Sequence, residues 1–206
     1  MVSASSADLA GSVDPFVRET VQQSVKILVV GAFGVGKTTL IESVSEIVPL
    51  RTEETMTEAS VDVDDLAGRP NKTTTTVAMD FGRITISERV VLYLFGTPGQ
   101  QRFWDLWEGL AEGAAGALVL VDTRHLQRSF EVLDQLETHN PQLPIAVVVN
   151  RFPDTQHHSP EELRAALDLL PETPVVDGDA RDRASSANAL VTLVDSVLTS
   201  QQEVIP

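Results

Sequence analysis

The sequence predicts an α/β domain whose doubly wound, mostly parallel sheet has six strands, helices on both faces and one antiparallel hairpin at an edge. Three observations carry this prediction. Continuous apolar runs at residues 27–30, 117–121 and 145–149 are typical of strands covered on both faces. Apolar residues at helical spacing follow these runs, and alternating apolar residues between 76 and 95 favour a hairpin.

Local signals predict the remaining elements. Pro49 ends the helix that follows the first strand, and the polar, acidic residues 50–71 predict a long loop. The hairpin is expected over 76–86 and 88–95, with a tight turn near Ser87. Apolar periodicity, with a capping box at Ser159, predicts further elements: helices over 100–112, about 130–136, 159–170 and 185–198, and a short strand at 174–176.

Composition restricts the class of protein. A chain of 206 residues fits one domain, which we expect over 25–200, with a partly disordered tail at 1–24 and a short tail at 201–206. The 30 acidic and 15 basic side chains give a net charge of −15, which disfavours binding to nucleic acid or to an anionic membrane.

The sequence also restricts covalent modification and membrane insertion. The absence of cysteine excludes disulfides, S-acylation and prenylation, and Val2 after the first methionine excludes myristoylation. No apolar run approaches ~18 residues. We therefore expect a cytoplasmic protein without direct membrane insertion, which only a partner could recruit to a membrane.

The main motif lies between the first strand and the first helix. Residues 31–38 match the pattern G-x-x-x-x-G-K-[ST], in the strand and helix context that the pattern requires. Its glycines let backbone N–H groups surround phosphates, Lys37 reaches the outer phosphates and Thr38 binds Mg²⁺. The fold is therefore expected to be that of a P-loop NTPase. The expected nucleotide contacts here are Gly31, Ala32, Phe33, Gly34, Val35, Gly36, Lys37, Thr38 and Thr39.

Three further polar loops follow predicted strands, at residues 96–103, 150–154 and 177–181. In a doubly wound sheet, ligands bind at the carboxyl ends of the strands. These loops and the phosphate loop are therefore expected to form one pocket.

Together these motifs resemble those of Ras-like small GTPases over about residues 25–198, most of all the bacterial branch of the gliding protein MglA and the conservon-encoded (CvnD-type) GTPases of actinobacteria. Residues 76–81 resemble the end of switch I, where a threonine precedes an aspartate-phenylalanine pair by the same spacing. The resemblance implies that Thr76 binds Mg²⁺ with Thr38 and senses the γ-phosphate. The threonines at 73–75 leave this register open by a residue or more.

Residues 96–103 resemble switch II. The resemblance implies that the Gly99 N–H contacts the γ-phosphate and that Gln100 orients the attacking water, so that Gln100, Lys37 and Thr76 form the catalytic set. Gly96 stands where the family usually has an aspartate, so a metal depends on Thr38, Thr76, phosphates and possible help from Asp80. Hydrolysis is expected to be slow. The bulky Phe33 argues against activation by a partner's arginine.

Two loops resemble those that read guanine. Asn150 and Arg151 match the first, but Pro153 takes the place of the usual aspartate and Asp154 follows one position late. Either the loop bulges so that Asp154 reaches the base, or selectivity for guanine is weakened. In the second loop the Ala180 N–H would meet guanine O6. That second loop consists of Asp179, Ala180 and Arg181.

The functional prediction is a GTP-binding switch that hydrolyses GTP slowly, with Mg²⁺ as cofactor. Its output would be the order or disorder of residues ~50–76 and ~96–112. The resemblance implies a roadblock-type regulatory protein and a sensor-kinase-like membrane protein as partners. Two alternatives stay open. One is a nucleotide-binding scaffold with negligible turnover, suggested by Gly96, Phe33 and the shifted Asp154. The other is an ATP-using P-loop enzyme.

Overall fold

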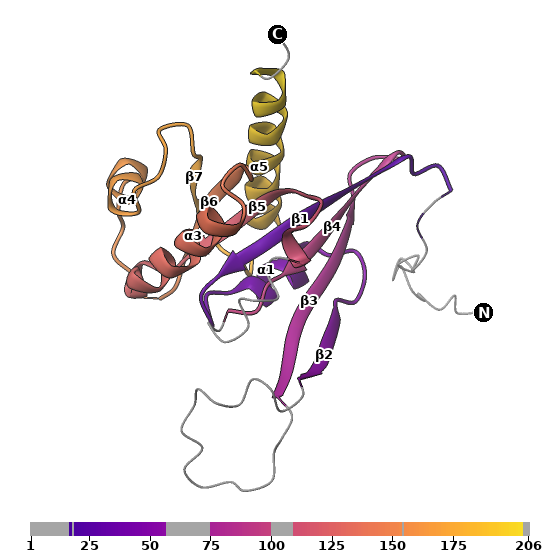
Figure 1. The fold of residues 1–206 in the computed structure, drawn as a ribbon, viewed down its shortest axis with the longest axis horizontal. Helices are drawn as coiled ribbons and strands as arrows, with labels where there is room; N and C mark the ends of the chain where they lie inside the picture. Colours follow the sequence, from indigo (N-terminus) through magenta and orange to yellow (C-terminus); the bar gives the residue numbers. More distant parts are fainter. Residues whose placement is uncertain (1–16, 18, 57–74, 100–108, 154, 204–206) are drawn as a thin grey trace, which may run out of the picture.

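The structure, a computed structural model, describes residues 17, 19–56, 75–99, 109–153 and 155–203 (Figure 1). Within these residues, seven strands form one sheet in the order β2-β3-β4-β1-β5-β6-β7. Neighbours from β4 to β7 are parallel, whereas β3 is antiparallel to both β2 and β4. The strands are β1 (Gln23–Gly31), β2 (Leu50–Met56), β3 (Thr75–Thr85), β4 (Val90–Gly96), β5 (Ala114–Val121), β6 (Ile145–Asn150) and β7 (Val175–Gly178).

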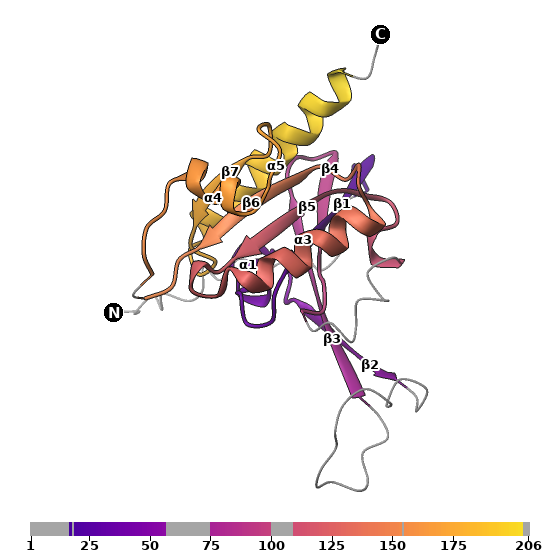
Figure 2. The ribbon, with the colours of Figure 1, turned by 60° about the vertical axis from the view of Figure 1, so that its left-hand side comes forward.

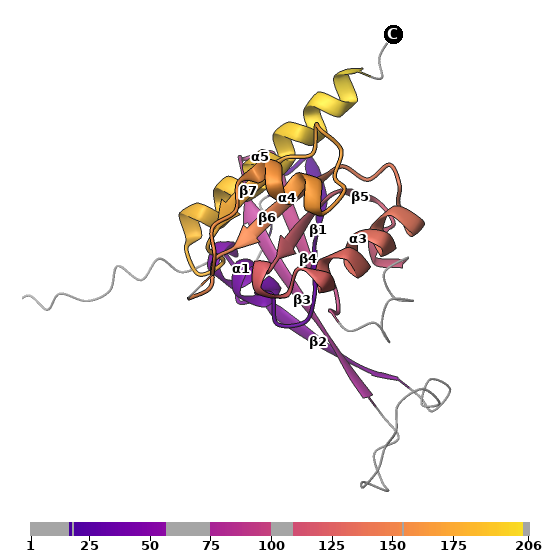
Figure 3. The same cartoon turned by 90° about the vertical axis from the view of Figure 1, so that its left-hand side faces the viewer.

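Helices cover both faces of this sheet. One face packs on α1 and α5 and the other on α3, and Figure 2 shows α3 and α5 separated by the strands. The short α4 lies beside the edge strand β7, as Figure 3 also shows. No described helix is both long and apolar enough to span a membrane. The helices are α1 (Lys37–Val44), α3 (Gln127–His139), α4 (Pro160–Ala166) and α5 (Arg183–Glu203), with a 3-10 turn η3 at Thr123–His125.

The central strand β1 divides the core in two. Ile27 and Val29 face α1 and α5, whereas Leu28 and Val30 face α3, and all four side chains are buried. Each such side chain contributes about 1.5–3 kcal/mol by leaving water. The continuous apolar runs are thus explained by burial on both faces, and the carboxyl ends of β1, β5 and β6 are held in fixed register.

The predicted P-loop NTPase fold is confirmed, but the sheet has seven strands rather than six. The extra strand is β2, whose residues 50–56 pair with 75–81 of β3 although their polar composition predicted a loop. Figure 1 shows β2 and β3 projecting together from the rest of the domain. The predicted hairpin of β3 and β4 is present, closed by the Ile86 N–H donating to the Val90 carbonyl at 3.0 Å.

The first helix ends earlier than predicted. It stops at Val44 instead of continuing to Pro49, because Ser45 adopts an extended conformation (φ −60°, ψ 137°). The Ser45 hydroxyl then accepts the Arg83 N–H at 3.2 Å, and the Glu46 N–H donates to the Arg83 carbonyl at 2.8 Å. These bonds to β3 replace the last predicted turn.

The other predicted elements show smaller differences. The closing helix extends to 183–203 and the last strand to 175–178. The capping box is present, since the Ser159 hydroxyl accepts the Glu162 N–H at 3.2 Å and the Glu162 carboxylate accepts the Ser159 N–H at 2.9 Å. The predicted helix over 100–112 lies mostly outside the described residues.

Candidate functional site

The phosphate-binding loop joins β1 to α1 and depends on glycine at two points. Gly36 has φ +107°, and a Cβ there would lie 2.6 Å from Asn150 Nδ2. A Cβ on Gly31, which has φ +148°, would lie 2.7 Å from the Leu120 carbonyl oxygen. L-residues rarely adopt such conformations, and neither position has room for a side chain. The loop is therefore fixed between β5 and the end of β6.

Lys37 closes the loop on itself. Its Nζ donates to the Gly31 carbonyl at 2.7 Å and to the Ala32 carbonyl at 2.9 Å, with only 8% of the residue exposed. Burial lowers the pKa of Lys37 from 10.5 to about 8, against the opposing attraction of the Asp80 carboxylate. Anionic phosphates in this loop would favour the charged ammonium group. The loop thus holds a buried cation at the predicted phosphate site.

Thr38, Asp80 and Gly96 meet at the start of α1. The Thr38 hydroxyl donates to the Asp80 carboxylate, and Asp80 is the cross-strand partner of Gly96 in the β3–β4 pair. A Cβ on Gly96 would lie 3.1 Å from the Asp80 Cβ and 3.0 Å from Ile41 Cδ1. The Asp80 side chain therefore occupies the space beside Gly96 and reaches the phosphate loop.

This oxygen pair fits a magnesium ion. Mg²⁺ takes oxygen ligands, keeps several waters, and is usually bound through one or two protein side chains together with phosphates. The Thr38 hydroxyl and the Asp80 carboxylate offer such oxygens beside Lys37. In the part of the chain that the structure describes, no group of three or more His, Cys, Asp or Glu could hold a metal. The nucleotide phosphates would therefore have to complete the coordination.

The structure describes some of the predicted switch residues and leaves others outside the described ranges. Gly99 lies directly against the phosphate loop, since a Cβ there would be 2.7 Å from both Lys37 Nζ and the Phe33 backbone nitrogen. Thr76 lies in β3 opposite Thr55 of β2, four residues from Asp80. Four residues of a strand span about 13 Å. Thr76 therefore lies along β3 from the Asp80 that contacts Thr38, and Gln100 lies outside the described residues.

Asn150 joins the phosphate loop to the second predicted base loop. Its side-chain Nδ2 donates to the Val35 carbonyl at 2.8 Å, and its Oδ1 accepts the Ala180 N–H at 2.9 Å. Asn150 is only 5% exposed. A single amide thus ties together the carboxyl ends of β1, β6 and β7, which brings these predicted site residues into one place.

Around Ala180, the other two predicted residues of this loop bind each other. Arg181 donates to both carboxylate oxygens of Asp179, each at 2.8 Å. These hydrogen bonds lower the pKa of Asp179 to about 2. Both side chains lie at the surface beside the buried Ala180. The pair fixes the shape of the loop that presents the Ala180 backbone.

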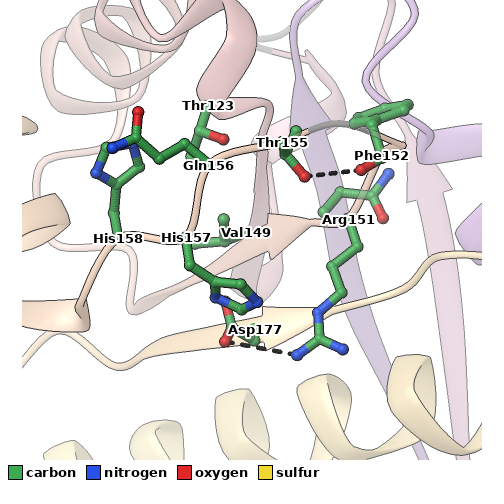
Figure 4. A pocket seen from close by; sticks show the side chains of 10 residues that line it. Thr123, Val149, Arg151, Phe152, Thr155, Gln156, His157, His158 and Asp177 are labelled. Atoms are coloured by element: carbon green, nitrogen blue, oxygen red, sulfur yellow. Dashed lines mark hydrogen bonds and ion pairs between the residues drawn. The ribbon is translucent and has the colours of Figure 1, made fainter.

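A cavity of about 220 Å³ lies beside the first base loop (Figure 4). Arg151 extends toward Asp177 of β7, with 3.7 Å between Nη2 and Oδ2. Asp154 lies outside the described residues, so the structure does not test whether its carboxylate reaches a base. The lining residues are Thr123, Val149, Asn150, Arg151, Phe152, Thr155, Gln156, His157, His158 and Asp177.

The loop after β5 was missed in the sequence prediction. The Arg124 guanidinium lies 3.8 Å from the centroid of the Phe152 ring and pairs with Asp122 at 2.8 Å. These contacts hold Phe152 of the first base loop against the loop that follows β5. The signal was available, because Asp122 directly follows an apolar strand at the carboxyl edge, as the other site residues do.

Comparisons with known proteins show the family of the chain. A sequence model of the family described as "Conserved hypothetical ATP binding protein" matches residues 29–200. An uncharacterized protein from Methanocaldococcus jannaschii is 29% identical over 132 residues, which cover 63% of this chain and 71% of that protein. The human Ras-related protein Rab-40A-like is 31% identical over 132 residues, or 62% of this chain and 41% of its own length.

A solved structure has the same fold. The G domain of the T. maritima FeoB iron transporter aligns with a TM-score of 0.53 and 16% identity, covering 86% of this chain and 98% of that one. At this identity the likeness concerns the fold alone. Together with the match over residues 29–200, it identifies the chain as a P-loop protein that belongs to the conserved hypothetical ATP binding protein family.

Proposed function

We propose that this protein is a nucleotide-dependent switch that binds GTP·Mg²⁺ and slowly hydrolyses GTP to GDP and phosphate. The observation that carries the proposal is the link made by Asn150, which bonds to the Val35 carbonyl at 2.8 Å and to the Ala180 N–H at 2.9 Å. One ligand with phosphates at one end and a purine at the other suits two loops held together in this way.

The chain's own groups would carry most of the catalysis. Lys37 and the backbone N–H groups of the phosphate loop would stabilise charge on the phosphate oxygens. Thr38, with Asp80 beside it, would hold Mg²⁺, which neutralises charge that develops on those oxygens. By resemblance, Gln100 would orient the attacking water. By resemblance, Thr76 would join Thr38 at the metal.

The backbone of Ala180 favours guanine. Guanine carries an acceptor, O6, where adenine carries an amino donor. The Ala180 N–H is a fixed donor at the end of β7 and now bonds to the Asn150 side chain. A donor at this point would attract guanine O6 and repel the adenine amino group. We therefore propose GTP rather than ATP as the preferred nucleotide.

ATP is the second candidate, for two reasons. Pro153 stands where Ras-like proteins have the aspartate that binds the guanine edge. The family that matches residues 29–200 is also described as ATP binding. Mass spectrometry of the nucleotide that co-purifies with the protein separates the two, and adenine nucleotides alone would overturn our preference for GTP.

Within the Ras-like proteins, we place the chain in the MglA and conservon branch. The run from Gly96 to Gln100, with glycine in place of the usual aspartate, supports this choice. A roadblock-type regulator and a sensor-kinase-like membrane protein are the partners that this branch implies. They would read residues 50–76 and 96–112, whose order would follow the γ-phosphate.

Two measurements test the proposal. Calorimetric titration with GDP, GTP, ADP and ATP should give binding that Lys37→Ala abolishes, and tight binding by that variant would overturn the assignment. A single-turnover assay of phosphate release should show slow hydrolysis that Gln100→Leu reduces further. Equal release by the two proteins would favour a scaffold without turnover.

A further inference from the structure

We propose that Arg124, in the turn η3 that follows β5, is a positioning residue for the nucleobase: it stacks on Phe152 and thereby fixes the loop that would meet the purine. This inference rests on the proposed function, because it concerns how the same nucleotide is held. Neither residue is among the predicted nucleotide contacts. Arg124 would act on the base only through the shape of the first base loop.

Asp122 holds the Arg124 side chain in one orientation. The guanidinium Nε donates to Asp122 Oδ1 at 2.9 Å, and Nη2 donates to Oδ2 at 2.8 Å. The Arg124 backbone N–H donates to the same Oδ1 at 3.0 Å. Two parallel bonds to one carboxylate fix the plane of a guanidinium as well as its place. Asp122 follows β5 directly and is only 9% exposed, so the pair is attached to the rigid sheet.

The oriented guanidinium contacts the first base loop through an aromatic ring. Its central carbon lies 3.8 Å from the centroid of the Phe152 ring, which is the distance of direct contact. A planar guanidinium stacks on an aromatic face, whereas a lysine ammonium group cannot stack in this way. Phe152 is half-buried, so water competes less with this contact than it would at an open surface. The loops that follow β5 and β6 are thus joined side chain to side chain.

This contact holds the part of the first base loop that lies beyond β6. The Arg151 N–H still donates to the Gly178 carbonyl of β7, at 2.7 Å. The next bond stays within the loop, because the Thr155 hydroxyl donates to the Phe152 carbonyl at 2.7 Å (Figure 4). Beyond Arg151, the loop is therefore tied to a neighbouring element by the Arg124 stack.

Losing the stack should affect a base and spare the phosphates. Asn150 would keep its bonds to the Val35 carbonyl and the Ala180 N–H, and Lys37 would keep its place in the phosphate loop. Residues 151–153, in contrast, would be free to move away from the purine. A nucleotide would then lose contacts to its base, whereas pyrophosphate, which has no base, would lose nothing.

The test is calorimetric titration, in the presence of Mg²⁺, with GDP, ADP and pyrophosphate. Arg124→Ala removes the stack, and the matched control is Arg128→Ala, which removes an exposed arginine of α3. We expect Arg124→Ala to weaken binding of the preferred nucleotide by about 2- to 30-fold, the range that measured cation–π contacts span. Its affinity for pyrophosphate should stay at the wild-type value. Arg128→Ala should match the wild type with all three ligands.

Conservative variants separate stacking from charge. Arg124→Lys leaves a cation beside Asp122 but cannot stack, so it should lose nucleotide affinity as Arg124→Ala does. Phe152→Tyr keeps an aromatic face and should bind nucleotide like the wild type, whereas Phe152→Leu should not. Because Arg124 and Phe152 act through one contact, Arg124→Ala combined with Phe152→Leu should cost little more than either change alone.

The outcomes distinguish the two proposals. If the wild-type protein binds neither nucleotide, the proposed function fails, and the role of Arg124 fails with it. If the wild type binds nucleotide and Arg124→Ala keeps that affinity, or loses nucleotide and pyrophosphate to the same degree, the function stands and the Arg124 inference is overturned. Additive losses in the double variant would overturn it as well. Should Arg124→Ala not fold, as judged by circular dichroism, Arg124→Lys decides against the same control. If pyrophosphate binds too weakly to measure, the double variant decides.

Discussion

Lys37 should make the stability of the ligand-free protein rise with pH. Burial lowers its pKa from 10.5 to about 8 in the folded state, and we take 10.5 for the unfolded chain. Between these values the unfolded chain binds more protons than the folded protein, so raising the pH favours folding across this window. The lysine is only 8% exposed, so solvent does little to reduce the shift.

The size of the effect follows from the two pKa values. A difference of one pKa unit corresponds to about 1.4 kcal/mol, so the shift costs about 3 kcal/mol when the lysine must be charged in the folded state. Between pH 7.5 and pH 9.5 the linkage relation gives a recovery of about 2 kcal/mol. The Lys37→Met variant, which has no proton to lose at this position, should show none of this recovery.

Urea denaturation of the wild type and of Lys37→Met at pH 7.5, 8.5 and 9.5 measures the difference. Other titrating groups are present in both proteins, so their effects largely cancel in the comparison. We expect the stability of the wild type relative to the variant to increase steadily with pH. Equal slopes for the two proteins would refute the reasoning, because Lys37 would then titrate alike in the folded and unfolded states.

Three other predictions concern the loops around the site. Asn150→Ala leaves a buried carbonyl and a buried amide without partners, at about 1–3 kcal/mol each, so the free energy of unfolding should fall by about 2–6 kcal/mol in urea denaturation. The control Asn188→Ala, on the exposed face of α5, should change it by under about 0.5 kcal/mol. Gly36→Ala should cost about 1–3 kcal/mol from backbone strain alone and weaken nucleotide binding, seen by calorimetry; wild-type affinity and stability would contradict the glycine argument. Ser159→Ala removes a helix cap and should cost about 1 kcal/mol in urea denaturation without changing nucleotide affinity.

Much of the fold could be predicted because its signals are local. The apolar runs of β1, β5 and β6 and the cap at Ser159 each reflect their own few residues. β2 could not be predicted in this way, since Glu53 and Glu54 give it the composition of a loop and only its pairing with β3 makes it a strand. The early end of α1 likewise depends on bonds to Arg83, about 40 residues away.

The same distinction between local signals and contacts of distant residues applies to the site. The phosphate loop is contiguous in sequence, so its residues were predicted together. The contact of Thr38 with Asp80 joins positions 42 residues apart and depends on how β3 lies against α1 and β4. The sequence offered Asp80 only as a possible helper to the metal. Strand register and the lack of a side chain at Gly96 explain why this carboxylate reaches the loop.

The groups of the site are hydrogen-bonded to one another, which affects how a nucleotide would bind. Lys37 binds the Gly31 and Ala32 carbonyls, Thr38 binds Asp80, and Asn150 binds two backbone groups. A nucleotide with Mg²⁺ would exchange these bonds for new ones, so each new contact would add less than its full strength.

Gly99 lies in close contact with the phosphate loop. It packs against Lys37 and the Phe33 backbone so tightly that a Cβ would lie 2.7 Å from each. Under the proposed function, a third phosphate would need space at this point, next to Lys37, whereas a diphosphate would need less. Gly99 would then shift when the γ-phosphate is present and return when it is lost, so a close backbone contact would become the sensor of hydrolysis. A Gly99→Ala variant should therefore disturb the ligand-free loop first. Its GDP affinity would change along with its GTP affinity, and a loss confined to GTP would argue against this packing.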